Sequence, residues 1–197
     1  MSKERPRERN LLRAQLDRVI AIQNSAYDRA RSSIQIALKP AALDRDLRRL
    51  DERLGRQLPD EVRTLFSWHD GCSVFLVPGV LYRGSEWSIE TFESISNIRL
   101  PALSNAVGTG QPGTLLPLFD MDRVLLTVAL PPEPAGETPL FYLDFEMDQL
   151  TMIARSVGAY VLRLLRALEA GNFEVTHHGL RWAHDPTEIS PEMTPFG

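Results

Sequence analysis

The sequence predicts an α+β fold: a single domain with a central, mostly antiparallel sheet and helices packed around it. Three observations predict this class. Helical apolar spacing dominates the amino-terminal third, short apolar runs between turn residues fill the middle, and one amphipathic helix follows them. Helices and strands are thus segregated along the chain, which favours α+β over the βαβ alternation of a Rossmann-type fold. The 197 residues are enough for one domain of ordinary size.

The amino-terminal part predicts two helices before residue 56. The first covers residues 8–30, and its packed face carries Leu12, Leu16, Val19, Gln23 and Tyr27. The second follows Pro40 and carries an apolar stripe of Leu43, Leu47, Leu50 and Leu54. Gly55 ends this helix, because glycine tolerates the left-handed backbone of a helix terminus.

A third helix is expected to have Pro59 in its first turn, where the fixed φ of proline fits and its missing N–H costs nothing. Asp60 and Glu61 then sit near the positive end of the helix dipole. Gly71 is expected to end the helix. The spacing of its apolar positions gives one packed face that carries Val62, Leu65, Phe66 and His69.

The rest of the chain predicts strands and one further helix. Residues 72–84 predict a strand, a turn and a strand, and residues 88–96 a short helix. Further strands are expected at 114–119, 123–130, 139–145, 150–154 and 172–175. The last helix is capped by Ser156, ends at Gly171 and carries a stripe of Val157, Tyr160, Val161, Leu164 and Leu168.

Charge is distributed unevenly along the chain. Residues 1–57 hold 14 basic and 8 acidic side chains, net +6, whereas residues 58–197 hold 8 basic and 18 acidic, net −10. The larger part is therefore a poor nucleic-acid binder and suits a basic partner, with simple solubility as the alternative. The single cysteine excludes an internal disulfide. No apolar run reaches the roughly 18 residues of a membrane span, so we expect a soluble, cytoplasmic protein.

One stretch resembles the parts of a thiol enzyme, because His69 and Asp70 lie just before Cys72, the only cysteine. A catalytic thiolate needs an activating base and a site for the oxyanion. Cys72, however, follows the carboxyl end of its predicted helix, where the dipole raises a thiol pKa. His69 continues the apolar stripe. We therefore interpret His69 as a half-buried packing residue held by local hydrogen bonds, and we predict no enzyme activity.

Two further patterns suggest ligand sites and are better explained as loop or surface. Gly108, Gly110 and Gly113 match the dinucleotide-binding fingerprint in spacing, but a loop and a strand follow them in place of the required helix. The histidines near the carboxyl terminus lack the cysteine or spaced acidic partners of a metal site; they are His177, His178 and His184. We predict no cofactor and no metal.

The most informative polar feature is a set of acidic residues at predicted strand ends. If the strands at 123–130 and 139–145 form a hairpin, five carboxylates gather at one rim of the sheet; they belong to Asp120, Asp122, Asp144, Glu146 and Asp148. A solvated turn is the simpler interpretation, and a binding rim for a cationic partner is the alternative that we pursue. Trp87 is a candidate aromatic anchor, unless it is a core residue beside Ile89.

The order of these segments resembles the SUKH superfamily, which includes fungal Smi/Knr cell-wall synthesis regulators and many bacterial immunity proteins. Its pattern is a helix ending in Leu-Gly, a Leu-Pro that opens the next helix, and an Asp-Gly near the end of that helix. Here these are Leu54 with Gly55, Leu58 with Pro59, and Asp70 with Gly71. Leu116 and Pro117 resemble the family's strand entry, although Leu115 replaces its common tryptophan. Residues 154–175 resemble its closing helix.

The resemblance implies a SUKH-like domain over residues 38–182, with residues 1–37 as an amino-terminal helical extension and 183–197 as a flexible tail. It implies an α+β fold and no enzyme activity. It also implies a bacterial immunity protein that neutralises a polymorphic toxin, of the nuclease or deaminase type, by stoichiometric binding. The expected partner is a basic toxin domain, with no nucleic acid or membrane. The alternative is a regulatory interaction module that binds several protein partners.

Overall fold

The computed structural model of the chain describes residues 4–71, 115–120, 124–129, 138–144, 149–176 and 179–182. Its helices are α1 (Glu4–Arg29), α2 (Asp44–Leu54), α3 (Asp60–Trp68) and α5 (Val157–Glu169). Its strands are β1 (Leu115–Asp120), β2 (Val124–Ala129), β3 (Leu140–Asp144), β4 (Gln149–Ala154), β5 (Phe173–Thr176) and β6 (Gly179–Trp182). This mixture of helices and antiparallel strands confirms the α+β class. The elements predicted at 72–84 and 88–96 and the tail lie outside the described residues.

The described strands form two sheets, so the prediction of a single central sheet is wrong. Strands β1 to β4 form an antiparallel meander in sequence order, while β5, among the strands that the structure describes, pairs with β6 alone. Helix α5 separates the two sheets along the chain. Its 13 residues carry the chain about 20 Å from the end of β4. There β5 pairs with β6, the strand that follows it.

Among the described strands, β1 lies at the edge of the larger sheet, and this position explains a proline inside it. Pro117 cannot donate a hydrogen bond to a ladder, which confines proline to edge strands and bulges. The register of β1 against β2 also shifts between Pro117 and Phe119. Leu118 lies at that shift and is buried, so the irregularity directs a leucine into the core.

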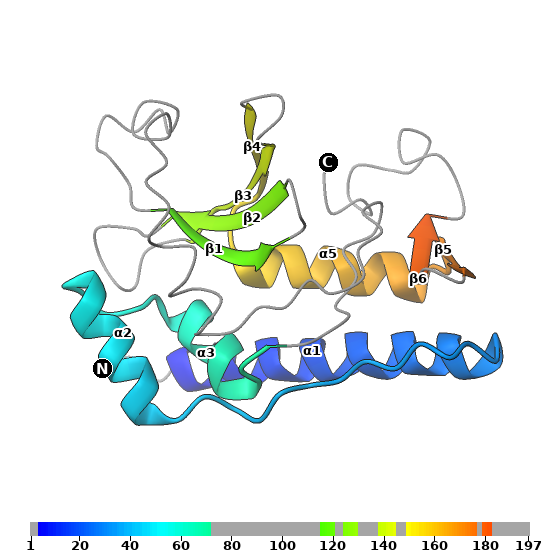
Figure 1. The fold of residues 1–197 in the computed structure, drawn as a ribbon, viewed down its shortest axis with the longest axis horizontal. Coiled ribbons are helices and arrows are strands. Elements are labelled where there is room, and N and C mark those ends of the chain that lie inside the picture. The colour runs from blue at the N-terminus through cyan, green and yellow to red at the C-terminus, as the bar shows by residue number, and fades with distance from the viewer. Residues whose placement is uncertain are drawn as a thin grey trace.

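The described helices lie on one side of the larger sheet, with α5 between the sheet and α1 (Figure 1). Helix α1 packs against both α5 and α3. The predicted packed face of α1 is buried in full, from Leu12 to Tyr27, and so is the predicted stripe of α5. Leucines and valines from both helices belong to one hydrophobic cluster with residues of α3 and the sheet. Helix α1 is therefore part of the same core as α5.

Three of the predicted helix ends are confirmed: the start of α5 and the ends of α5 and α2. Ser156 Oγ accepts a hydrogen bond from the Ala159 N–H at 3.1 Å and so closes the start of α5. Gly171 (φ 73°) and Gly55 (φ 63°) follow the ends of α5 and α2 in the left-handed region, where a β-carbon is unfavourable.

Two details at helix starts differ from the predictions. Leu43 was expected on the stripe of α2, but it precedes the helix with an extended backbone and its side chain is 51% exposed. The helix begins only at Asp44, so the stripe begins at Leu47. Pro59 lies at the cap position of α3 with ψ 148°, not within its first turn. Its carbonyl accepts the Arg63 N–H at 2.9 Å, the first hydrogen bond of that helix.

Candidate functional site

The stretch that resembles a thiol enzyme is a structural junction. Helix α3 ends at Trp68, so the prediction that His69 extends its packed face and that Gly71 ends it is wrong. His69 has an extended backbone, and its ring meets the Trp68 ring edge to face at 4.6 Å. Its Nδ1 lies 2.6 Å from the Lys39 carbonyl. His69 is therefore half-buried and hydrogen-bonded, as predicted, and it holds the segment that precedes α2. Cys72 lies outside the described residues.

The structure describes the backbone of two of the five residues predicted to form the acidic rim. Strands β1 and β3 both pair antiparallel with β2, so they run in the same direction. Asp120 ends β1 opposite Leu125, and Asp144 ends β3 opposite Val124, which is the first residue of β2. The backbones of both aspartates therefore lie at the same end of the larger sheet. Asp122, Glu146 and Asp148 lie outside the described residues.

The remaining candidates also lie outside the described residues: Trp87, the glycines at 108, 110 and 113, and the histidines at 177, 178 and 184. Among the residues that the structure describes, no group of three or more histidine, cysteine or acidic side chains is arranged to hold a metal ion. None of the described helices has the length and apolar character to span a membrane.

The sequence did not reveal that Glu61 closes the amino terminus of α5. Its carboxylate accepts hydrogen bonds from the Val157 N–H at 3.0 Å and the Gly158 N–H at 3.1 Å, and the Thr138 hydroxyl also donates to it. The first N–H groups of a helix have no partner within it and carry partial positive charge. Glu61 lies in the first turn of α3, as predicted. Its carboxylate also accepts a hydrogen bond from the first residue of α5, which lies 96 residues later in the sequence.

Gly158 allows this close approach. A β-carbon at residue 158 would lie 2.8 Å from Glu61 Oε1, which is well inside van der Waals contact. The glycine of the Ser-Val-Gly start of α5 is therefore needed for space and not for backbone conformation. A glycine within the first turn of an amphipathic helix was the only sequence signal of this contact.

A second carboxylate joins α2 to α3. Asp51 Oδ1 accepts the Leu58 N–H at 2.7 Å, and its Oδ2 forms an ion pair with Arg63. Both side chains of the ion pair are largely buried. Asp51 therefore fixes the turn that carries the Leu-Pro motif, so the spacing between α2 and α3 depends on a side chain contributed by α2.

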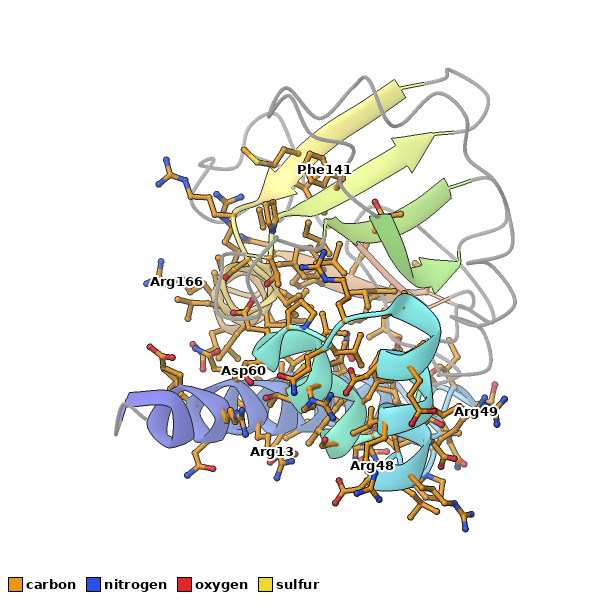
Figure 2. The ribbon with its side chains drawn as sticks, turned by 90° about the vertical axis from the view of Figure 1, so that its left-hand side faces the viewer. Arg13, Arg48, Arg49, Asp60, Phe141 and Arg166 are labelled. Carbon is orange, nitrogen blue, oxygen red and sulfur yellow. The ribbon has the colours of Figure 1, made fainter. Side chains whose placement is uncertain are left out.

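Polar contacts at helical spacing hold α1 against α3. Arg9 pairs with Asp60, Arg13 donates to the Ser67 carbonyl at 3.4 Å, and the Trp68 indole N–H donates to Asp17 at 2.7 Å. Figure 2 shows Arg13 and Asp60 on the side where these two helices meet. Arg9, Arg13 and Asp17 are four residues apart and so lie on one side of α1. This row determines how α1 is aligned along α3.

The core also contains polar groups without a hydrogen bond. Both side-chain polar atoms of Gln23, the Thr127 hydroxyl and the Tyr160 hydroxyl are buried and lack a partner in the described residues. Burial raises the pKa of Tyr160. Tyr160 also lines a small cavity whose other walls are apolar: Leu16, Leu65, Leu118, Leu140, Val157 and Val161. Such a lining offers at most one hydroxyl to a bound molecule, so the cavity belongs to the core.

Comparison with known proteins gives no match: neither a family model nor a curated protein aligns with the chain. The resemblance to the SUKH superfamily therefore stays a prediction. Glu61, Asp51 and Asp17 each accept a hydrogen bond from another part of the fold. We therefore assign these three carboxylates a structural role. Asp120 and Asp144 are the part of the predicted site whose backbone geometry is described, and we call these two residues the acidic sheet end.

Proposed function

We propose that this protein is a non-enzymatic binding protein with a SUKH-type fold, and that it acts as a bacterial immunity protein. It neutralises a cognate toxin domain of the nuclease or deaminase type by binding it stoichiometrically. The observation that carries the proposal is the net charge of −10 on residues 58–197, together with the backbones of Asp120 and Asp144, which end β1 and β3 at the same end of the larger sheet.

Electrostatics supplies the mechanism. A nuclease that acts on nucleic acid needs a basic groove, because phosphate contacts supply most of its affinity. An acidic surface is attracted to such a groove and raises the association rate, an effect that salt weakens. In the proposal, the carboxylates at the sheet end occupy the phosphate sites of the toxin. The toxin is then inhibited by exclusion of its substrate, with no reaction on the immunity protein.

Electrostatic attraction raises the association rate, but tight binding also needs an apolar residue near the centre of the interface. Interfaces commonly rely on a few aromatic residues that are fully desolvated in the complex. Trp87 takes this role in the proposal. Asp122, Glu146 and Asp148 are the further carboxylates that we propose for the acidic rim, since each lies within four residues of Asp120 or Asp144 in the sequence.

The alternative is a regulatory module that binds several protein partners, which the same ordered motifs favour because fungal members of the family share them. The two proposals differ in the expected gene neighbourhood. A toxin gene beside the gene for this protein favours immunity, whereas an operon for the cell envelope or for signalling favours the module.

The test is co-purification with the toxin domain encoded beside the gene, followed by a protection assay in cells that express the toxin. We expect a complex of one immunity protein per toxin and survival of the cells. The matched negative control is a toxin domain from an unrelated neighbourhood, which is expected neither to bind nor to be neutralised. If the cognate toxin is not bound and the cells are not protected, the proposal is wrong.

A further inference from the structure

Helices α1, α2 and α5 end in the same backbone motif, in which a residue with positive φ follows the last turn and the next N–H donates to a carbonyl five residues earlier. These hydrogen bonds run from Ser32 to Tyr27, from Arg56 to Asp51 and from Asn172 to Ala167, at 2.9, 3.1 and 3.3 Å. Glycine is the usual residue at the left-handed position, and Gly55 and Gly171 occupy it after α2 and α5. After α1 the residue is Arg31, with φ 51°.

Arg31 is the one non-glycine residue with a positive φ among the residues that the structure describes. The left-handed backbone is unfavourable for an L-residue, because its β-carbon comes too close to the following carbonyl oxygen. The side chain of Arg31 is exposed, so core packing does not hold it in this conformation. At Arg31 the chain reverses, and an extended segment runs back toward α2 in the direction opposite to α1 (Figure 1). An ordinary conformation at Arg31 would remove this strain and point α1 away from the body.

Helix α1 is buried too deeply to stay in water after such an opening. Leu16 and Val19 are 0% exposed. The α1-binding surface that they cover includes Leu65 of α3 and Tyr160 and Val161 of α5, which line the same cavity as Leu16. An opened α1 is therefore stable only where the same contacts are offered again. A second copy of this chain offers them on its own α1-binding surface.

The extended segment is held in place without α1. The Lys39 N–H donates to the Gly71 carbonyl and the Asp70 N–H donates to the Pro40 carbonyl, both at 2.9 Å. These two bonds join the segment to the chain that follows α3. The segment can therefore stay on its own body while α1 leaves, which places the hinge at residues 30–32.

We propose that two copies of this protein exchange α1 by domain swapping through a hinge at Arg31, so that each α1 occupies the α1-binding surface of the other copy. The swapped dimer regains the contacts of α1 with α3 and α5 and relieves the strain at two hinges. Strained hinges favour this kind of exchange. The exchange does not involve Asp120 or Asp144, so it does not depend on the function proposed above.

The first experiment asks whether the dimer forms and whether it is swapped. The full-length protein is held at millimolar concentration in urea below the unfolding midpoint, so that α1 can leave its surface, and is then returned to buffer. Size-exclusion chromatography with light scattering is expected to show a dimer. A dimer made from equal amounts of isotope-labelled and unlabelled chains should give nuclear Overhauser effects between the Leu16 methyls of one chain and the Tyr160 ring of the other.

A series of substitutions at Arg31 tests the hinge. Arg31→Gly is expected to raise the dissociation constant of the dimer by at least about 25-fold, because each of two hinges loses a preference of about fivefold or more for the open form. Arg31→Ala is the matched control: it removes the charge and keeps the β-carbon, so it should dimerise as the wild type does. Arg31→Val should dimerise more tightly, since a β-branched residue tolerates a positive φ least.

Three results overturn the proposal. The first is that the wild type stays monomeric at millimolar concentration after the urea treatment. The second is a dimer without the Overhauser effects between Leu16 and Tyr160 of different chains, which makes it an ordinary surface contact. The third is that Arg31→Gly dimerises as tightly as Arg31→Ala, which removes backbone strain as the cause.

Discussion

The helical layer and the acidic sheet end use carboxylates for different purposes. In the layer, Glu61, Asp51 and Asp17 each accept a hydrogen bond from another structural element, at 2.7–3.0 Å. At the sheet end, Asp120 and Asp144 terminate strands, and we propose that they face a partner. Changes in the layer should therefore lower stability and spare binding, whereas changes at the sheet end should do the reverse.

The largest expected effect on stability is in the core beneath the sheet. Leu164 on α5 is 0% exposed, and Leu164→Ala is expected to lower the free energy of unfolding by about 2–5 kcal/mol, the usual cost of a leucine-sized cavity. Urea unfolding followed by circular dichroism measures it. Leu162→Ala removes the same atoms from a partly exposed position of the same helix and should cost clearly less.

The next largest effect is expected at the carboxylate that closes α5. Glu61→Ala leaves the Val157 and Gly158 N–H groups and the Thr138 hydroxyl without their acceptor. We expect a loss of about 2–3 kcal/mol, because hydrogen bonds to a charged group are among the stronger ones. Glu61→Gln retains an acceptor oxygen and should cost less. A loss no greater than that of Glu52→Ala, at an exposed residue of α2, would contradict the role of Glu61.

A smaller effect is expected where α1 meets α3. Asp17→Ala removes the acceptor of the Trp68 indole N–H, 2.7 Å away, and should cost about 1 kcal/mol, the typical value of one hydrogen bond. The Trp68 indole resonance should shift in the same variant, which ties the loss to this contact. Asp28→Ala, at an exposed residue of α1, serves as the control and should change neither quantity.

The smallest effect is expected at Tyr160, whose buried hydroxyl has no partner in the described residues. Tyr160→Phe should leave stability at pH 7 unchanged or slightly higher, since a buried polar group without a hydrogen bond is unfavourable. Burial raises the pKa of Tyr160 in the folded state, so above pH about 10, the ordinary tyrosine value, only the unfolded state releases this proton. Stability should then fall with pH more steeply in the wild type than in Tyr160→Phe. Equal slopes would contradict this burial.

Local features of the fold could be predicted from the sequence. Apolar residues three and four apart identified the buried faces of α1 and α5, and Ser156, Gly171 and Gly55 marked helix ends, because each signal involves neighbours within one or two turns. Helix boundaries were less certain. Leu43 and His69 continue the apolar spacing but lie just outside their helices, since spacing alone does not show where hydrogen bonding stops.

Contacts between distant segments could not be predicted in the same way. Glu61 was interpreted through the dipole of its own helix, yet its partners at the start of α5 lie 96 and 97 residues away. The strand at 172–175 was expected, but its exclusion from the larger sheet depends on the path of α5. For the candidate site, the predicted antiparallel pairing does bring the backbones of Asp120 and Asp144 to one end of the larger sheet. That these residues bind a partner stays a proposal, which rests on charge and not on the fold.

The most direct test of the proposed binding compares two double variants with the same change in charge. Asp120→Asn with Asp144→Asn alters the sheet end, and Glu8→Gln with Glu52→Gln alters exposed residues of α1 and α2. Affinity for the toxin encoded beside the gene is measured by calorimetry at two salt concentrations. The account predicts at least a tenfold loss of affinity and a weaker salt dependence for the sheet-end variant alone. Because the proposal requires both aspartates to be free to meet a partner, the unfolding free energy of that variant should stay within about 0.5 kcal/mol of wild type. Equal affinities for both variants would contradict it.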